Sequence, residues 1–534
     1  MESGSNYWES WWRRRASRRG FLRAAGGIGA ASVLAACTPA QQAPSAAPGQ
    51  PSTGTTEGVP QVLKHAIANP PVTLDPNGTA LSSSYFYALY DALTRVDHNA
   101  KIHPGLAESW RPVDDSTWEF KLRPTKWSDG SPFTADDVKW TYEYVLDTAN
   151  KSAIASRISN VASLTAVDPT TIRIATKGPD PLMPARAFFI PILPKAYISR
   201  VGIQEFSLKP IGTGAFTIKE YRQGTRAVFV PNPQSWRKPK LTELWLLEIP
   251  EATTRLAALR TNEVDAADLI SRQDAQRLQN DPAFNVVTGN SAGSYNFDVE
   301  YFNPPYSDKR VRLALNHAID KESIVKNLLL GYGRVMDGQL LPQNVFGYNP
   351  NLKPLEYDPK KAKELLAAAG YTNGFETAIE FSTSTADARL IAEAMFQYLA
   401  DVGVKAELKP VEVGVWRQHI YEGGRSPIFW NPWSAQAPLD AEFIYSWYGA
   451  DSFNNKPYWK NDAFEAAYSK SRRELDPTKR LALLQQAAAA MREDPPVLFM
   501  MQGSSIWTTA KRVQNFIGTA SGYIWYDDIQ IVKA

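Results

Sequence analysis

The chain has few of the residues that build disulfide frameworks and metal sites. Among its 534 residues cysteine occurs once, as Cys37, so no disulfide can form within the chain. Histidine occurs five times, and no two histidines have the His-x-x-x-His spacing that places two ligands on one helical face. His98 and His103 lie five apart in an expected loop, where solvated side chains are the common case. The sequence therefore predicts no metal site and no cofactor.

Long apolar runs are also scarce near the N-terminus. The uncharged stretch from Ala24 to Ala36 has 13 residues, whereas a helix needs about 20 to cross a bilayer. This stretch is too short for a permanent anchor and is typical of the apolar core of an export signal.

An excess of charge of one sign is missing as well. The formal net charge is +3, but the first 36 residues hold six arginines and two acids. The other 498 residues carry 52 basic and 53 acidic side chains. A nucleic-acid surface needs clustered lysine and arginine in clear excess. The composition therefore argues against nucleic acid as a partner.

The N-terminal segment carries two signatures of export. Arg18-Arg19 before Phe21-Leu22 resembles a twin-arginine signal, and Leu34-Ala35-Ala36-Cys37 resembles a bacterial lipoprotein cleavage site. We expect residues 1–36 to be a signal peptide and Cys37 to carry a lipid anchor. The protein is then an exported lipoprotein, held at the periplasmic or extracellular face of a membrane.

A low-complexity segment follows the cysteine. Residues 38–60 are rich in Pro, Ala, Ser, Thr and Gly and contain one charged residue, Glu57. Such a composition buries too little apolar surface to offset the entropy of ordering. Residues 37–60 are therefore predicted to be a flexible linker between the lipid and the folded body.

Hydrophobic alternation predicts several strands in the folded body. They are expected at residues 117–122, 171–176, 216–219, 227–230 and 244–249. The third and fourth flank Gln223-Gly224 and read as a hairpin, and the last is dense enough for a central strand. The short loop Gly212-Thr213-Gly214 is expected to use positive φ angles at its glycines.

Capping residues mark three helices. Thr134 with Asp137 has capping-box spacing, Asp358-Pro359 opens a helix that Gly370 ends, and Asp476-Pro477 opens a helix that reaches about Arg492.

A fourth helix is predicted from an apolar stripe. Val311, Leu315, Ala318 and Ile319 lie on one helical face, which predicts a single helix over 309–330, ended by Gly331.

The order of the predicted elements indicates the fold class. Because helices and hairpins interleave, mixed-sheet α/β lobes are expected. The chain is longer than the roughly 250–300 residues that one hydrophobic core holds, so two or three domains are expected.

Several sequence blocks resemble one known family. Leu106–Trp110, Trp118–Arg123 and Lys126–Val138 follow one another in the order found in the cluster-5 extracellular solute-binding proteins of ABC transporters, the peptide/opine/nickel-binding family. Further blocks agree with it: Leu74–Pro76, Gly212–Phe216, Asp308–Leu315, Ala318–Lys321 and Tyr357–Tyr371.

The resemblance implies a fold and its division. It implies a two-lobed α/β fold like that of periplasmic binding proteins, with mixed sheets and an inserted extra domain. Lobe I is then expected at 61–97, 191–293 and 500–534, the inserted domain at 98–190, and lobe II at 294–499.

The resemblance also implies a function without chemistry. The protein is expected to be the monomeric substrate-binding component of an ABC importer, which encloses a peptide or related small organic solute and delivers it to a membrane permease. Within the same class an oligosaccharide is the first alternative and a nickel chelate the second. A solute sensor would share these sequence features, and a secreted hydrolase is disfavoured because the histidines are scattered.

The chain departs from the family pattern at one important position. Peptide-binding members carry, after a Trp of the second lobe, an Asp that pairs with the ligand's amino group. In the stretch that starts at Trp433-Ser434, Gln436 occupies that place, and a neutral amide forms no charge-assisted bond to an ammonium. Asp440 is a possible substitute.

Aromatic residues surround that position. Trp416, Trp430 and Trp433 are candidates for contact with an apolar or sugar-like ligand face, although rings at such positions are often core. In the other lobe, Tyr85, Tyr90 and Asp91 are the candidates, and Asp91 has a structural ion pair as its alternative. The predicted ligand-binding set is Trp433, Gln436, Trp430, Asp440, Ser434, Trp416, Tyr85, Tyr90 and Asp91.

Overall fold

The computed structural model describes residues 55–533 except 69, 72, 79–83, 100, 385, 435–439, 451–458 and 520–521, together with the backbone alone at 290–292 and 433–434. The predicted signal peptide, Cys37 and most of the predicted linker lie outside the described residues. All described residues belong to one compact unit, 51–534. None of its described helices is both long and apolar enough to cross a membrane.

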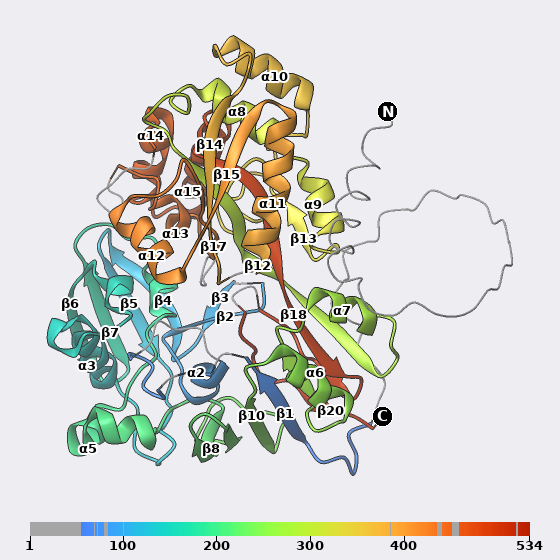
Figure 1. Cartoon of the computed structure of the whole chain (residues 1–534). Coiled ribbons are helices and arrows are strands. Elements are labelled where there is room, and N and C mark those ends of the chain that lie inside the picture. The colour runs from blue at the N-terminus through green and yellow to red at the C-terminus, as the bar shows by residue number, and fades with distance from the viewer. Residues whose placement is uncertain are drawn as a thin grey trace, which may run out of the picture. The chain divides into compact units, whose positions relative to one another are not determined.

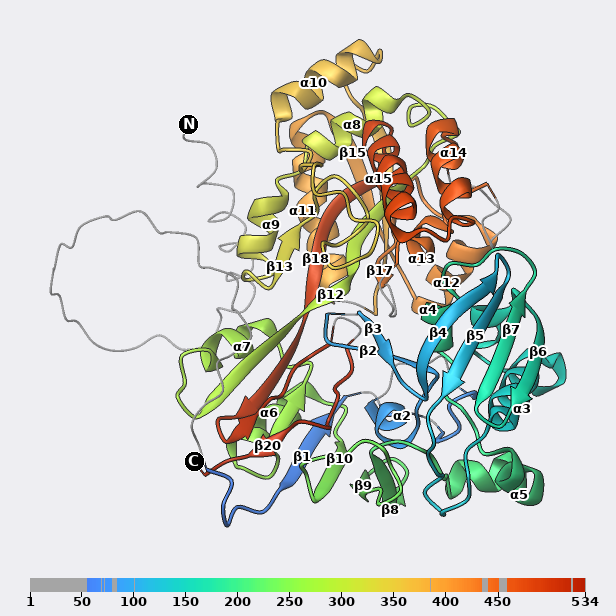
Figure 2. The same cartoon turned by 180° about the vertical axis from the view of Figure 1, so that it is seen from behind.

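Two long antiparallel strands connect two groups of strands in one large sheet (Figures 1 and 2). They are β12 (Phe284–Val299) and β18 (Val497–Ala510), paired from Phe284 opposite Ala510 to Asp298 opposite Val497. Their register shifts between Asn290 and Ser294. One end of this ribbon pairs with β11 (Ala266–Asp268) and the other with β16 (Ile428–Trp430).

The first group of strands continues from β11 through β1, β10, β9 and β8. Its elements are β1 (Val62–Ile67), β8 (Phe216–Arg222), β9 (Arg226–Pro231), β10 (Glu243–Glu248), α2 (Ser84–Leu89), α6 (Ala252–Arg260), α7 (Arg272–Leu278), β19 (Val513–Gln514) and β20 (Gln530–Ile531). Strand β1 is parallel to both β10 and β11.

A separate four-stranded antiparallel sheet runs in the order β4-β5-β7-β6, and α3 packs on it. This part of the chain comprises β2 (Thr94–Val96), β3 (Ile102–Pro104), β4 (Ala107–Asp114), β5 (Thr117–Leu122), α3 (Ala135–Leu146), η1 (Thr148–Asn150), η2 (Ala155–Ile158), β6 (Val161–Asp168), β7 (Thr171–Thr176), α4 (Met183–Ala187) and α5 (Lys195–Leu208).

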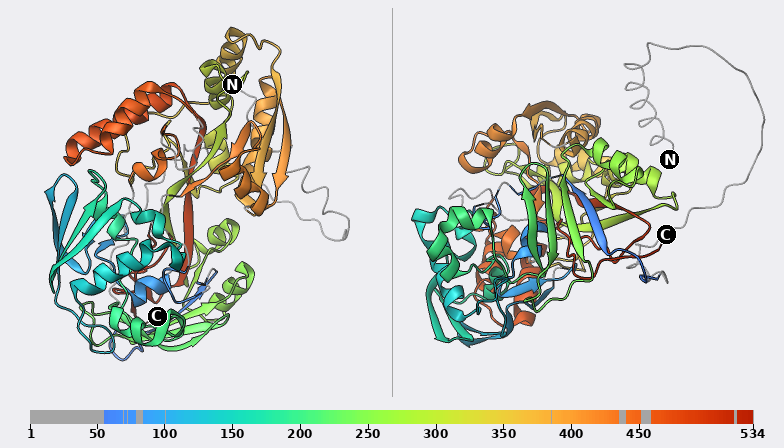
Figure 3. Two further views of the ribbon diagram at one scale, coloured as in Figure 1. Left: turned by 90° about the vertical axis from the view of Figure 1, so that its left-hand side faces the viewer. Right: turned by 90° about the horizontal axis from the view of Figure 1, so that it is seen from below.

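The second group of strands is β15-β14-β16, joined to β12. With its helices it comprises α8 (Lys309–His317), α9 (Lys321–Asn327), β13 (Gly333–Val335), α10 (Pro359–Ala368), β14 (Phe375–Ser382), α11 (Ala386–Asp401), β15 (Val404–Val411), α12 (Val413–Glu422), β17 (Trp433–Ser434), α13 (Glu442–Tyr445), α14 (Asp462–Ser471) and α15 (Pro477–Glu493). The left-hand view of Figure 3 shows β12 and β18 passing between the two groups from a further direction.

Most of the predicted elements are confirmed. The alternating patterns form β5 and β7, the hairpin is β8–β9 with its turn at Gly224 (φ +76°), and β10 lies between β1 and β9. Helices α3, α10 and α15 begin at the predicted caps: the Asp137 carboxylate accepts the Thr134 backbone N–H at 2.9 Å, and Asp358 and Asp476 accept N–H groups of their own first turns.

The prediction of one helix over 309–330 was wrong. Helix α8 ends at His317, and α9 starts at Lys321. The Asp320 side chain caps α9, because its carboxylate accepts the Ser323 backbone N–H at 2.9 Å and the Ser323 hydroxyl at 2.6 Å. A periodic stripe does not reveal a break when the capping residue falls on the polar face. Gly331 does follow the end of α9, with φ +82°.

The prediction for the Gly212–Gly214 loop was also wrong. Neither glycine is among the residues with positive φ. Glycine is required there by close approach: a Cβ would lie 1.9 Å from the Leu89 carbonyl oxygen at Gly212 and 2.4 Å from the Ala88 oxygen at Gly214. The loop therefore packs against the end of α2, which carries the predicted site residue Tyr85 and is followed by two more, Tyr90 and Asp91.

Candidate functional site

The carboxyl ends of parallel strands β1, β10 and β11 form one edge of the first group. Ligands of open α/β sheets bind at such edges. The buried Arg255 guanidinium holds this edge together, donating to four carbonyl oxygens at 2.6 to 2.9 Å: those of Ile249, Pro250, Asp268 and Leu269. Leu269 is 46% exposed and has φ +50°, so an apolar side chain is held outward at this edge.

Tyr85 lies at the same edge. Its hydroxyl donates to Glu248 Oε1 at 3.1 Å, at the end of β10, and the ring is fully buried against Phe229. Burial raises the pKa of Tyr85 and also that of Glu248. The structure therefore places Tyr85 at the edge with its hydroxyl engaged by a carboxylate.

Parallel strands β14, β15 and β16 present a second carboxyl edge. Strand β14 pairs in parallel with both β15 and β16. The chain leaves β16 at Trp430 and re-enters as β17, in which Trp433 pairs with Ser294 of β12 and Ser434 with Gly293. The predicted Trp430–Ser434 segment thus follows a strand end directly. Only the backbone of Trp433 and Ser434 is described, and Gln436 lies outside the described residues.

Two of the predicted tryptophans are joined by a hydrogen bond from the Trp416 side chain to the Trp430 backbone. Trp430 is 1% exposed and its ring lies against Tyr295 and Phe297, at centroid distances of 5.3 and 5.1 Å. The half-buried Trp416 donates its indole N–H to the Trp430 carbonyl at 2.9 Å and stacks on Phe429. Trp430 fills core in this structure, so its contact with a ligand stays a prediction that its burial disfavours.

The side chains of three further predicted ligand-binding residues, Asp440, Tyr90 and Asp91, form hydrogen bonds or ion pairs within the protein. Asp440 is buried and forms a bidentate ion pair with Arg480, at 2.5 and 2.7 Å. The buried Tyr90 hydroxyl donates to the Leu74 carbonyl at 2.7 Å.

Asp91 is the third of these. It pairs with Arg237 at 3.2 Å and accepts from the Thr213 hydroxyl at 3.2 Å and the Trp236 indole at 3.0 Å. Although burial lowers the pKa of Arg237, Asp91 and Asp527 outweigh it and raise this pKa overall. The alternative to ligand contact that the sequence offered for Asp91 was a structural ion pair, and the structure has such a pair with Arg237.

An ion pair that sequence reasoning missed links the two edges. Arg272, at the start of α7, donates to both carboxylate oxygens of Asp387 in α11, at 2.5 and 2.7 Å, and the Tyr295 hydroxyl of β12 donates to Asp387 at 2.8 Å. The side chains of Arg272 and Asp387 are 17% and 12% exposed. These partners lie 115 residues apart, and no local sequence signal joins them.

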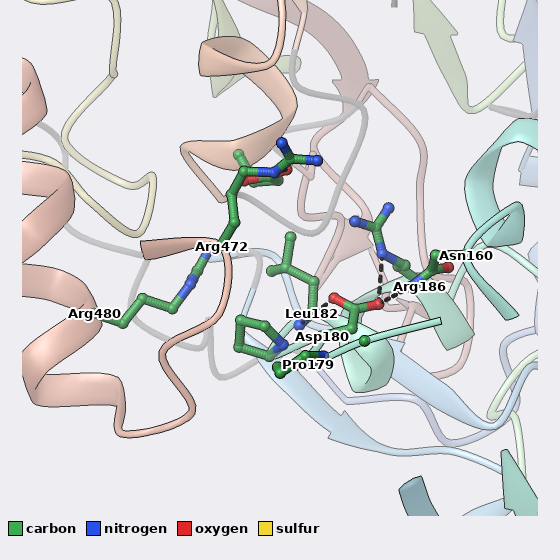
Figure 4. A pocket seen from close by; sticks show the side chains of 10 residues that line it. Asn160, Pro179, Asp180, Leu182, Arg186, Arg472 and Arg480 are labelled. Carbon is green, nitrogen blue, oxygen red and sulfur yellow. Dashed lines mark hydrogen bonds and ion pairs between the residues drawn. The ribbon is translucent and has the colours of Figure 1, made fainter. Parts of the chain in front are cut away.

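A pocket of about 130 Å³ lies beside Asp440 (Figure 4). Arg472 and Arg480 come from one wall, and Asp180, Leu182 and Arg186 from the other. The complete lining is Asn160, Gly178, Pro179, Asp180, Pro181, Leu182, Arg186, Glu442, Arg472 and Arg480. Within it Asp180 pairs with Arg186 at 3.0 Å and Glu442 with Arg472 at 3.3 Å.

In the described part of the chain, a sequence pattern typical of serine hydrolases lacks the turn that it would need, and no metal-binding cluster is formed. Residues 289–293, Gly-Asn-Ser-Ala-Gly, have the spacing of a hydrolase nucleophile turn, yet they lie inside strand β12 instead of at a strand-to-helix turn. Among the described residues no group of three His, Cys, Asp or Glu side chains is arranged to hold a metal ion.

Comparison with known proteins decides the family. The model of bacterial extracellular solute-binding proteins, family 5 (middle), matches residues 101–455. The chain belongs to this family. It is therefore an exported solute-binding protein of the kind that serves ABC transporters, a family of binding proteins and not of enzymes.

Relatives agree in sequence and in structure. The chain is 27% identical over 476 residues to glutathione-binding protein GsiB of Shigella flexneri serotype 5b (strain 8401), covering 84% of this chain and 91% of the relative. The structure of HbpA2 from Haemophilus parasuis matches with a TM-score of 0.79 at 26% identity, over 88% of this chain and 100% of that one. The periplasmic binding protein DppA from Helicobacter pylori, in complex with peptide STSA, matches with a TM-score of 0.72 at 26% identity, over 88% and 98%.

These similarities confirm the predicted fold class. The family 5 chain has the two-lobed α/β fold of periplasmic binding proteins, with mixed sheets and an additional domain. The exact domain boundaries given above stay predictions.

Proposed function

We propose that this family 5 protein captures a peptide or a peptide-like organic solute between its lobes and hands it to the permease of an ABC importer. The observation that carries the proposal is the pair of carboxyl edges, β1/β10/β11 and β14/β15/β16, joined by β12 and β18. Relatives that bind glutathione and peptide STSA support the ligand class. No chemical step is proposed at this site.

The two-edge arrangement suits a hinge mechanism. A ligand that touches both lobes stabilises the closed state by its differential affinity for that state. Moving the population from mostly open to mostly closed takes about 5.5 kcal/mol of such preference. The register shift of β12 between Asn290 and Ser294 lies midway between the two groups of strands, and we propose it as the bending point.

Ligand screening by thermal shift tests the proposed ligand class. Binding to the native state raises the unfolding midpoint by mass action, so short peptides are expected to raise it while oligosaccharides leave it unchanged. If oligosaccharides raise the midpoint and peptides do not, the oligosaccharide alternative replaces the peptide proposal.

We also propose that Cys37 carries the lipid anchor and that the mature protein acts as a monomer at the membrane surface. Intact mass measurement on protein from its native host is expected to find a chain that starts at Cys37 with a lipid adduct. A chain that keeps residues 1–36, or an unmodified Cys37, would contradict this assignment.

A further inference from the structure

Asp268, the last residue of β11, carries a carboxylate that forms no ion pair with a lysine or arginine of the described chain. Its side chain is 19% exposed, and among the described residues the only basic group at ion-pair distance is His65 Nε2, 3.4 Å from Oδ1. Arg255 uses its guanidinium nitrogens on four carbonyl oxygens, one of which is the Asp268 backbone oxygen. Because charges so far out of water are as a rule paired, this carboxylate points to a cation from outside the chain.

The residues behind Asp268 fix the direction of its carboxylate. His65 is 1% exposed, its Nδ1 lies 2.8 Å from the Tyr526 hydroxyl, and its ring packs edge-on against Phe516. The Ala68 backbone N–H donates to Asp268 Oδ2 at 3.5 Å. None of these four groups is a permanent cation, so they orient the carboxylate and leave its charge for a ligand.

Asp268 also lies close to the contact between the two groups of strands. Arg272 follows four residues later, and a chain of that length spans at most about 14 Å. The Arg272 guanidinium bonds both carboxylate oxygens of Asp387 in α11, which belongs to the second group. Asp268 therefore stands on the segment of the first carboxyl edge that runs directly into this contact.

The neighbouring side chain makes an organic cation a better match than a metal ion. Leu269 is 46% exposed and has φ +50°, so apolar surface adjoins the carboxylate along the chain. A metal ion needs several ligands, and within the described ranges no three His, Cys, Asp or Glu side chains are arranged to hold one. A single carboxylate beside apolar surface fits an ammonium on a carbon chain.

We infer that the Asp268 carboxylate binds an amino group of the ligand, in its ammonium form, at the carboxyl edge of the first group of strands. This inference rests on the proposed function and deepens it by the substrate class: peptides or peptide-like solutes with a free amino group. It also supplies an acid for the ammonium that the neutral Gln436 cannot pair with.

Two peptide libraries test this role. One holds di- and tripeptides with free amino termini and without Lys or Arg, and the other holds the same sequences with acetylated amino termini. Capture by the wild-type protein, read by mass spectrometry, is expected to recover members of the first library and none of the second. In calorimetric titration the best-retained peptide is expected to bind at least about tenfold more tightly than its acetylated form.

Substitutions then assign the preference to Asp268. Asp268→Asn removes the charge at almost constant shape and is expected to bring the affinities for the free and acetylated peptide to within about threefold of each other. Glu251→Gln changes an exposed acid at the same edge, so it is the matched control and keeps the wild-type preference. Asp268→Ser gives the same readout if the Asn variant does not fold.

Each other outcome is decisive. A wild-type protein that binds acetylated peptides as tightly as free ones, an Asp268→Asn variant that keeps the preference, or equal losses of preference in Asp268→Asn and Glu251→Gln overturns the role of Asp268 alone. A wild-type protein that retains no peptide of either library overturns the proposed function, and the role of Asp268 with it.

Discussion

Single buried cationic side chains hold separate backbone segments of this molecule together. Arg255 donates hydrogen bonds to four carbonyl oxygens at one strand edge. Lys321 likewise connects α8 to a neighbouring loop by hydrogen bonds to carbonyl oxygens. The Lys321 Nζ donates to the carbonyls of Asn316 and Leu355 at 2.7 and 3.0 Å, and the side chain is 3% exposed. Burial lowers the pKa of Lys321 to about 7.

This lowered pKa predicts a pH dependence of stability. In the unfolded chain the Lys321 pKa is about 10.4, so between pH 7 and 9 the unfolded state binds more protons than the folded state. The free energy of unfolding of the wild type is therefore expected to rise by about 2 kcal/mol over this range relative to Lys321→Met. Urea denaturation of both proteins at pH 7, 8 and 9 measures this, and parallel curves would contradict it.

For single residues of the candidate site, only part of the role could be predicted from the sequence. Tyr85 and the Trp430–Ser434 segment were candidates for ligand contact from sequence, and the structure has them beside the carboxyl ends of strands β10 and β16. The sequence could not decide between ligand contact and an internal role for Trp430, Asp440 and Asp91, because their partners come from distant segments: Arg480 lies 40 residues from Asp440. Glu442 and Arg272 carry no local signal at all.

At the scale of elements, caps decide where helices begin and end. The three helices with Asp or Thr caps followed by Pro or a second acid were predicted correctly, since the capping signal is local. The break between α8 and α9 was missed because the apolar stripe keeps its helical spacing past the end of α8: Val311, Leu315, Ala318 and Ile319. Asp320, which caps α9, comes only after this stripe.

Removing that cap tests the explanation of the break. Asp320→Ala deletes the acceptor for the Ser323 N–H and is expected to lower the free energy of unfolding by about 1 kcal/mol. Glu322→Ala, exposed in the same turn, should change it by less than about 0.5 kcal/mol. Equal effects in the two variants would show that the Asp320 carboxylate is not acting as a cap.

For the whole molecule, the Arg272–Asp387 ion pair is a direct side-chain link between the two strand edges described above. It connects α7 of the first group with α11 of the second, and Tyr295 of β12 joins it. A bidentate, largely buried pair of this kind couples the positions of the elements that carry it.

A double-mutant cycle measures that coupling. Arg272→Met, Asp387→Asn and the double variant are expected to give an interaction free energy of about 1–3 kcal/mol in denaturant unfolding, because each single change leaves a partly buried group unpaired. Single-variant effects that add to within about 0.5 kcal/mol would show that the pair does not link the two groups.

Enclosure of a ligand between the lobes is the central claim, and solution X-ray scattering with and without a bound peptide tests it most directly. The account predicts a smaller radius of gyration for the liganded protein, with the bound molecule recovered unchanged by mass spectrometry. Superimposable scattering curves at saturating ligand, or a cleaved ligand, would contradict it.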